Sequence, residues 1–179
     1  MLETIILAFI IAKIKGYKLK SLFKSWEIYP VLGFELMYVI MQISVFMGDY
    51  SFIKYAGIYK TLYLYSVLFL VFKYRLYISA IIGSGFIFIG TALNKIAIAA
   101  NNGNMPVFPS FSYYTGYATP DSFSKIKDIH ILGNETTKLK FLTDIFDVGY
   151  SILSIGDIFI RLFVFVIIYN TIKHLNETR

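Results

Sequence analysis

Residues 77–99 read YISAIIGSGFIFIGTALNKIAIA and contain one charged side chain, Lys95. At about 1.5 Å per residue, a helix of this length crosses a hydrocarbon core about 30 Å thick. Ser79 and Gly83 are spaced four residues apart, and small residues at this spacing let membrane helices approach closely. The stretch therefore predicts a membrane-spanning helix at the packing centre of a helical bundle.

The composition of the whole chain supports a membrane protein. Of its 179 residues, 57% are hydrophobic and 16% are charged, and the mean hydropathy is +0.65. An average soluble domain has about 25% charged residues. The net charge of +6 lies in loops between apolar stretches, where it sets orientation in a bilayer, so we expect a lipid partner and no nucleic acid. The absence of cysteine excludes disulfides and thiolate catalysis.

Four more apolar stretches accompany the first and complete an all-α, polytopic membrane bundle. We expect about five transmembrane helices in a single integral membrane domain, 1–179. They are predicted over residues 2–14, 26–47, 55–72, 77–99 and 151–172. The first stretch is short for a bilayer. A cleaved signal peptide would need a basic segment before its apolar run, whereas the charge at this position is that of Glu3. Residues 100–150 are polar and are predicted to form one long loop.

The distribution of cations predicts the orientation. One set of helix ends carries nine Lys and Arg residues, and the other carries five. The larger set comprises Lys13, Lys15, Lys18, Lys20, Lys24, Lys73, Arg75, Lys173 and Arg179, and the smaller comprises Lys54, Lys125, Lys127, Lys138 and Lys140. Cytoplasmic loops carry the excess of positive charge. We therefore expect a multi-pass protein of the cell membrane with its N-terminus and the 100–150 loop outside and its C-terminus in the cytoplasm.

Polar side chains inside the apolar stretches are the first candidates for function, because burying charge in lipid is costly. They are Glu35, Gln42, Lys60, Asn94, Lys95, Asp157 and Arg161. Asp157 and Arg161 are four residues apart and lie on one helix face, within reach of an ion pair. This pair either neutralises itself and fixes the rotation of the helix, or holds Asp157 ionised for substrate, cation or proton binding. Glu35 has no cation at helical spacing on its own stretch.

The polar loop supplies the second group of candidates. Asn101-Asn102-Gly103-Asn104-Met105-Pro106-Val107 directly follows the helix over 77–99. Its Asn and Gly residues tolerate left-handed backbone, so we expect a sharp turn there. His130, Asp144 and Asp157 follow. One histidine with scattered carboxylates lacks the fixed spacing of a metal site, and we expect neither a metal nor another cofactor.

Together these strings resemble a family of small bacterial integral membrane proteins that is known only as a domain of unknown function. Its pattern is Asn-Gly-Gly-x-Met-Pro-Val, a histidine, a Leu-x-Asp segment and a closing Ser-x-Gly-Asp. The matching residues here are Asn101, Gly103, Met105, Pro106, Val107, His130, Leu142, Asp144, Ser154, Gly156 and Asp157. The resemblance implies a site built from these strings and implies no reaction.

Three functions are compatible with the sequence. The first is a binding or accessory membrane component that takes a small molecule, lipid or peptide at the outer leaflet. Its site is predicted to comprise Asn101, Gly103, Met105, Pro106, His130, Asp157 and Arg161. The second is an intramembrane aspartyl hydrolase with Asp144 and Asp157 as a catalytic dyad, similar to lipoprotein signal peptidases. The third is the substrate-capture subunit of an importer, which would dock on a membrane-protein partner.

Overall fold

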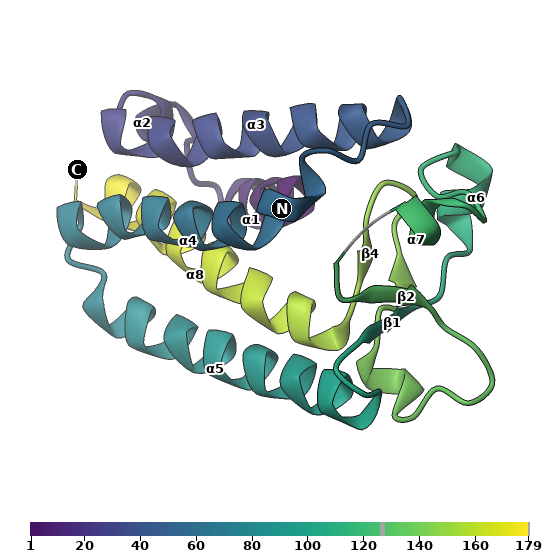
Figure 1. The fold of residues 1–179 in the computed structure, drawn as a ribbon. Helices are drawn as coiled ribbons and strands as arrows, with labels where there is room; N and C mark the ends of the chain where they lie inside the picture. The colour runs from purple at the N-terminus through teal and green to yellow at the C-terminus, as the bar shows by residue number, and fades with distance from the viewer. Residues whose placement is uncertain (126–127, 179) are drawn as a thin grey trace. The chain divides into compact units, whose positions relative to one another are not determined.

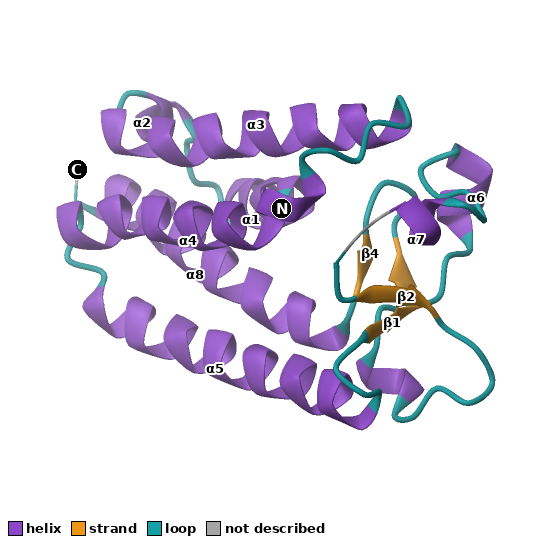
Figure 2. Cartoon of the chain, in the orientation of Figure 1, coloured by secondary structure: helices purple, strands orange, loops and turns teal. Residues whose placement is uncertain are grey.

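The computed structural model describes residues 1–125 and 128–178, and most of them are helical (Figures 1 and 2). The long helices are α1 (Leu2–Ile14), α3 (Tyr29–Phe46), α4 (Ala56–Lys73), α5 (Tyr77–Ala100) and α8 (Ile155–Glu177). The short helical segments are α2 (Lys20–Phe23), η1 (Trp26–Ile28), η2 (Ile53–Tyr55), α6 (Phe111–Thr115), α7 (Ser122–Lys125) and η3 (Lys140–Leu142). Lys127 and Arg179, which the orientation count included, lie outside the described residues.

Four helical stretches are long and apolar enough to cross a membrane. They are Trp26–Phe46, Ile53–Lys73, Tyr77–Ala100 and Ile155–Glu177. The prediction of a mainly helical protein with apolar spans is confirmed at this level. With 13 residues, α1 covers about 20 Å, which is shorter than a hydrocarbon core, so its crossing of the bilayer stays a prediction.

The described chain forms two compact units. The first contains Met1–Tyr38, Ile58–Ile87 and Ile160–Arg179, and the second contains Val39–Gly57 and Phe88–Phe159. In the first unit, Ala8 and Ala12 of α1 are fully buried in one apolar cluster with Val67 of α4 and Ile168 of α8. Alanines four residues apart on one helix face leave room for neighbouring helices to approach closely.

The second unit contains strands that the sequence did not indicate. Strand β1 (Met105–Val107) pairs in parallel with β2 (His130–Leu132), and β3 (Phe146–Asp147) pairs antiparallel with β4 (Ile152–Leu153). The stretch 100–150, predicted as a polar loop, therefore contains small sheets (Figure 2). Because β4 and Ser154 precede it, α8 begins at Ile155, four residues later than the predicted start.

Glycines on α5 mark where other segments come closest. In the first unit, a Cβ atom built on Gly83 would lie 2.6 Å from Cδ2 of Phe163. In the second unit, Gly90 presents its carbonyl oxygen to Gly156 of α8. Gly85 is exposed and has no atom within 4 Å of a built Cβ. Small residues thus allow close packing on one face of α5, but α5 is the least buried of the four apolar stretches and α8 is the most buried. The prediction that α5 is the packing centre is therefore wrong.

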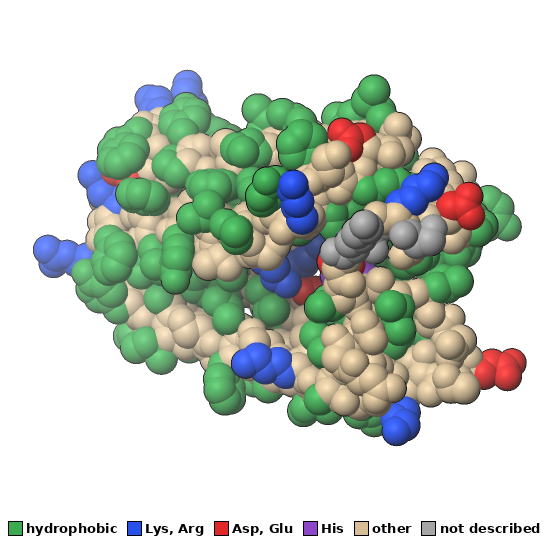
Figure 3. All heavy atoms as spheres, in the orientation of Figure 1, with side chains coloured by type: hydrophobic (Ala, Val, Ile, Leu, Met, Phe, Trp, Pro, Cys, Tyr) green, Lys and Arg blue, Asp and Glu red, His purple; other side chains and the backbone are tan. Residues whose placement is uncertain are grey.

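The opposite face of α5 is apolar and exposed. Ile78, Ile81 and Phe88 are each more than 70% exposed. Leu36 and Met37 of α3 are also exposed, and hydrophobic side chains cover much of the visible surface over α3 and α4 (Figure 3). Large contiguous apolar surfaces are rare on soluble monomers, whereas they match the hydrocarbon core of a bilayer.

Candidate functional site

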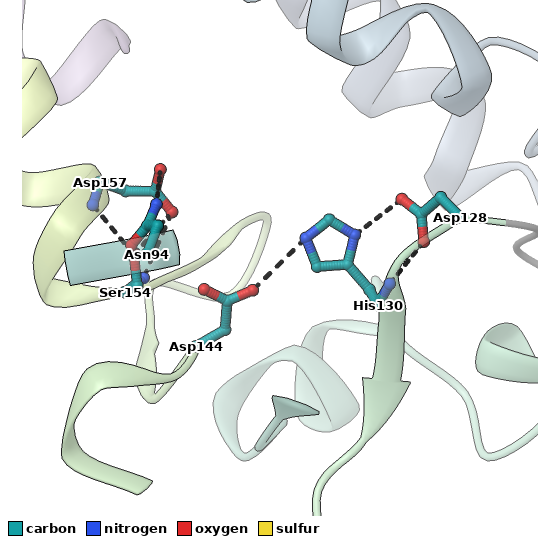
Figure 4. A network of polar contacts seen from close by, with 6 residues as sticks. All are labelled: Asn94, Asp128, His130, Asp144, Ser154 and Asp157. Carbon is teal, nitrogen blue, oxygen red and sulfur yellow. Dashed lines mark hydrogen bonds and ion pairs between the residues drawn. The ribbon is translucent and has the colours of Figure 1, made fainter. Parts of the chain in front are cut away.

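His130 is held between two carboxylates in the second unit (Figure 4). Its Nδ1 atom lies 2.7 Å from Oδ2 of Asp128, and its Nε2 atom lies 3.6 Å from Oδ2 of Asp144. Asp128 also accepts the backbone N–H of His130 at 2.8 Å, so this carboxylate fixes both the backbone and the ring. The imidazole is therefore oriented by one carboxylate and directed at another.

Strand β1 brings His130 and Asp144 together. Met105 of β1 lies opposite His130 of β2. On the other side of the strand, the N–H of Asp144 donates to the carbonyl of Pro106 at 3.1 Å, and the N–H of Phe108 donates to the carbonyl of Asp144 at 2.8 Å. Asp144 is 3% exposed, whereas the His130 side chain is 40% exposed. The reactive ring is thus accessible and its carboxylate partner is buried.

The surrounding charges favour the protonated form of His130. Burial alone would lower the pKa of His130, but the hydrogen bond and charge of Asp128 outweigh this effect, and the charges of Asp144 and Asp157 add to them. The net result is a raised pKa for His130. The pKa of Asp128 is lowered, because contact with His130 outweighs burial. The carboxylates around His130 therefore favour the protonated imidazole over the neutral one.

Asp157 belongs to a second polar network at the start of α8 (Figure 4). Its N–H donates to Oγ of Ser154 at 2.9 Å, and its Oδ2 atom accepts the Ser154 hydroxyl at 3.0 Å and the Ser154 N–H at 3.4 Å. This reciprocal arrangement is a capping box, here with an aspartate in the third helical position. Asn94 of α5 joins it. Its Oδ1 atom lies 2.8 Å from Oγ of Ser154 and shares that hydroxyl proton with Asp157, and its amide donates to Oδ1 of Asp157 at 3.4 Å.

Gly156 allows this network to form. A Cβ atom at this position would lie 2.5 Å from the carbonyl oxygen of Gly90 and 2.7 Å from Cγ of Asn94, and would also overlap Oδ1 of Asn94. The Ser-x-Gly-Asp string therefore has a structural explanation. Serine and aspartate cap α8, and glycine lets its first turn approach α5.

The Asn-rich turn after α5 leads into β1 and is fixed by hydrogen bonds to neighbouring segments. Asn101 joins Lys138 through two hydrogen bonds of 2.9 Å, and its amide also donates to the carbonyl of Ala97. Gly103 turns the chain with a φ of +86°, in the left-handed region that glycine adopts without strain. Met105 is buried with Ala97 and Leu142. These residues build the scaffold and leave His130 to face the solvent.

Arg161 lies in the first unit. Its Nη1 atom is 2.9 Å from Oε2 of Glu3, which provides a partner that the sequence did not indicate. The predicted pairing of Asp157 with Arg161 stays a prediction. Of the predicted site residues, the second unit thus contains Asn101, Gly103, Met105, Pro106, His130, Asp144 and Asp157.

Three polar features of this unit were missed or undervalued from the sequence. Asp128 lies two residues before His130, a spacing that lets a carboxylate accept the backbone N–H ahead of it. Ser154 and Asp157 have the spacing of a capping box, which is visible in the sequence. Asp147 accepts N–H groups from Ser110, Ser112 and Gly149, and nothing in the sequence indicated those long-range partners.

The arrangement offers hydrogen-bond acceptors and negative charge. Within residues 1–125 and 128–178, no group of three or more His, Asp or Glu side chains has the geometry to hold a metal ion. His130 can exchange a proton, and the neighbouring carboxylates can bind hydrogen-bond donors.

Comparison with known proteins places the chain in a family without assigning an activity. Neither the curated proteins nor the solved structures contain a match. One family model matches residues 19–169, a range that covers most of the chain and includes both polar networks of the second unit. The protein therefore belongs to the family of unknown function DUF5317.

Proposed function

We propose that the protein is an integral membrane protein that binds a ligand bearing a primary ammonium group, at a site formed by His130, Asp128 and Asp144. The loop that carries the site faces the outside of the cell in this proposal, as the asymmetry of Lys and Arg predicts. The bound group belongs to a small molecule or to a lipid headgroup.

The placement of His130 between two carboxylates is the observation that carries the proposal. Asp128 and Asp144 contact the two ring nitrogens of His130, and these carboxylates, with the charge of Asp157, raise the pKa of the imidazole. An ammonium group carries a positive charge that carboxylates attract and N–H donors that their oxygens accept. An anionic ligand would meet repulsion at the same place.

Accessibility also supports binding at this position. His130 is partly exposed, and Asp128 retains 23% of its side-chain exposure, so a ligand can reach both without unfolding the unit. Asp144 lies behind them and is fixed by backbone hydrogen bonds to β1. A buried carboxylate on a rigid strand pair provides a preorganised partner for the ligand.

Binding to ethanolamine and to ethylene glycol tests the proposal, because these probes have the same size and differ in charge. We expect ethanolamine to stabilise the purified full-length protein against heat and ethylene glycol to have no effect. Asp144→Asn should weaken ethanolamine binding roughly 10- to 150-fold, since a charge-assisted hydrogen bond contributes about 1.5–3 kcal/mol. Asp128→Asn, at a more exposed position, should act in the same direction.

Glu135→Gln provides the matched control. It removes one exposed carboxylate from the same stretch of chain and leaves the His130 contacts intact. Equal binding of both probes, or equal losses in Asp144→Asn and Glu135→Gln, would refute the proposal. Native mass spectrometry with phosphatidylethanolamine and phosphatidylglycerol distinguishes the source. Selective retention of phosphatidylethanolamine identifies a lipid headgroup, and binding of free ethanolamine alone identifies a small molecule.

The other two hypotheses keep the status of predictions. The contacts of Asp157 with Ser154 and Asn94 give this carboxylate a capping role, which lends no support to an Asp144–Asp157 hydrolase dyad. The importer-subunit hypothesis requires a membrane-protein partner, and co-purification is the observation that would favour it.

A further inference from the structure

A run of lysines in the first unit takes no part in the His130 site. Residues 13–24, KIKGYKLKSLFK, contain five lysines and no acidic residue, and we call this stretch the basic segment. Its exposed lysines are Lys13, Lys15, Lys18, Lys20 and Lys24. Among the described residues, no carboxylate lies within ion-pair distance of any of them. The basic segment therefore presents five positive charges that the described part of the chain does not neutralise by contact.

Buried side chains and backbone hydrogen bonds hold the basic segment in place. Leu22 of α2 is fully buried in the apolar cluster of the first unit. Asn176 of α8 accepts the backbone N–H of Lys18 at 2.8 Å and donates to its carbonyl at 3.2 Å. The Tyr17 hydroxyl donates to Oε1 of Glu177 at 3.0 Å. The backbone that carries the lysines is thus fixed to α8, so binding a ligand to their charges does not require this backbone to be ordered first.

Other cations at this end of the first unit already have carboxylate partners. Nζ of Lys73 lies 3.1 Å from Oε1 of Glu27. Nζ of Lys173 lies 3.9 Å from Oε1 of Glu177. Lys and Arg side chains gather over α2 and the neighbouring ends of α4 and α8 (Figure 3). Because both glutamates are engaged with other lysines, the charge of the basic segment remains available to attract an anion from outside the chain.

Apolar side chains are interleaved with the exposed lysines. Ile14, Phe23 and Trp26 are exposed, as is Tyr29 in the following turn. Trp26 is also the first residue of the stretch Trp26–Phe46, which is long and apolar enough to cross a membrane. Tryptophan and tyrosine at the end of a span lie at the level of the lipid headgroups, and clusters of lysine beside a span bind anionic lipids. The basic segment thus has the composition and the position of a headgroup-binding surface.

We propose that the basic segment binds the phosphate groups of anionic phospholipids, with Trp26 beside the adjoining acyl chains and the headgroups held by Lys18, Lys20 and Lys24. Lysine ammonium groups donate charge-assisted hydrogen bonds to phosphate oxygens. A lipid surface fits better than a soluble polyanion, because exposed apolar side chains alternate with the lysines and a candidate span follows directly. The inference rests on the membrane embedding in the proposed function. It is independent of ammonium binding at His130, which uses residues of the second unit.

Fluorescence of Trp26 tests the proposal, because this residue is the single tryptophan of the chain and is 62% exposed. The full-length protein would be reconstituted in phosphatidylcholine vesicles that contain a small fraction of a lipid with brominated acyl chains. The brominated lipid is phosphatidylglycerol in one series and phosphatidylcholine in the other. Bromine quenches indole fluorescence at close contact, so the extent of quenching measures how often each lipid lies beside Trp26.

We expect phosphatidylglycerol to be preferred over phosphatidylcholine beside Trp26 by at least about fivefold at low salt, since one lysine near an anionic surface contributes about this factor. The preference should disappear when the salt concentration is raised from about 0.1 M to about 1 M, because the Debye length falls from about 10 Å to about 3 Å.

Two triple variants locate the preference. The segment variant, which combines Lys18→Gln, Lys20→Gln and Lys24→Gln, should lose it at low salt. The control variant removes the same charge from exposed positions of the second unit and should keep it; it combines Lys125→Gln, Lys138→Gln and Lys140→Gln. Should the segment variant fail to fold, the salt series on the wild-type protein still decides the question.

Three results would overturn the proposal. They are equal quenching by the two brominated lipids at low salt, a preference that the segment variant retains, and equal losses in the segment and control variants. Equal quenching together with tight binding of a short RNA in detergent would assign the basic segment to nucleic acid instead.

The same measurements separate this inference from the proposed function. Quenching by neither lipid would contradict the membrane embedding itself, whereas equal quenching by both would contradict only the binding of anionic headgroups. Because the basic segment would itself retain phosphatidylglycerol, the comparison of phosphatidylethanolamine with phosphatidylglycerol at the His130 site is made in the segment variant. Loss of phosphatidylethanolamine in Asp144→Asn then reports on the His130 site alone.

Discussion

Replacing Gly156 by alanine tests the contact between α8 and α5 in the second unit. The added methyl group would lie 2.5 Å from the carbonyl oxygen of Gly90 and would overlap the Asn94 amide. Asn94 can rotate only by giving up its hydrogen bonds to Ser154 and Asp157, and the backbone of Gly90 cannot move without bending α5. Overpacking of this kind typically lowers the free energy of unfolding by about 1–3 kcal/mol. Because the clash involves backbone, we expect a loss of about 3 kcal/mol for this variant.

The expected loss is large enough to measure. For a protein of this size, about 2–4 °C in Tm corresponds to each kcal/mol, so Gly156→Ala should lower Tm by roughly 6–12 °C. Circular dichroism of the purified protein in a mild detergent provides the measurement. Gly85→Ala is the matched control, because it adds the same methyl group to an exposed position of α5 with no atom within 4 Å. Helix propensity predicts a gain of up to about 1 kcal/mol there. Equal Tm values for the two variants would refute the close-approach explanation of the Ser-x-Gly-Asp string.

Three further predictions concern the polar contacts of the second unit. Ser154→Ala should cost about 1 kcal/mol through loss of the helix cap and should increase hydrogen exchange in the first turn of α8; unchanged exchange would contradict the capping role. Because His130 has a raised pKa in the folded protein, its stabilisation is present below the usual value of 6.5 and is lost as pH rises through the folded-state pKa. Asp128→Asn should move the His130 pKa downward in an NMR titration, and an unchanged titration would exclude Asp128 as its main partner. Asp147→Asn should cost roughly 2 kcal/mol, since a carboxylate that accepts several N–H groups is replaced, and should raise exchange at the Gly149 amide. Protection at Gly149 equal to that of the wild-type protein would be evidence against this role.

The apolar spans were predictable because run length and the scarcity of charge determine which segments enter a bilayer. The first residue of α8 was harder to predict. Residues 151–154 are compatible with a helix by composition, but Ile152 and Leu153 pair with β3, and this pairing is not visible in two apolar residues. Local periodicity gives no information about a partner strand that is only two residues long.

The candidate site shows the same division between local and long-range information. The turn at Asn101 and Gly103 follows from residue types that tolerate left-handed backbone. His130 meets Asp144 because β1 lies between the segments that carry them. The strand Met-Pro-Val is too short for the sequence to predict which segments pair with it. Arg161 contacts Glu3, 158 positions away, which no spacing argument within one helix can reveal.

The bond between Ser154 and Asn94 spans 60 positions and has a consequence for biosynthesis. Asn94 emerges from the ribosome and reaches the bilayer well before its partner has been translated. A nascent chain released at any point before Ser154 therefore lacks the residue that would satisfy this amide, and β3 lacks its companion strand. Incomplete molecules would carry unsatisfied polar groups and an unpaired strand edge, which is a template for pairing with another chain.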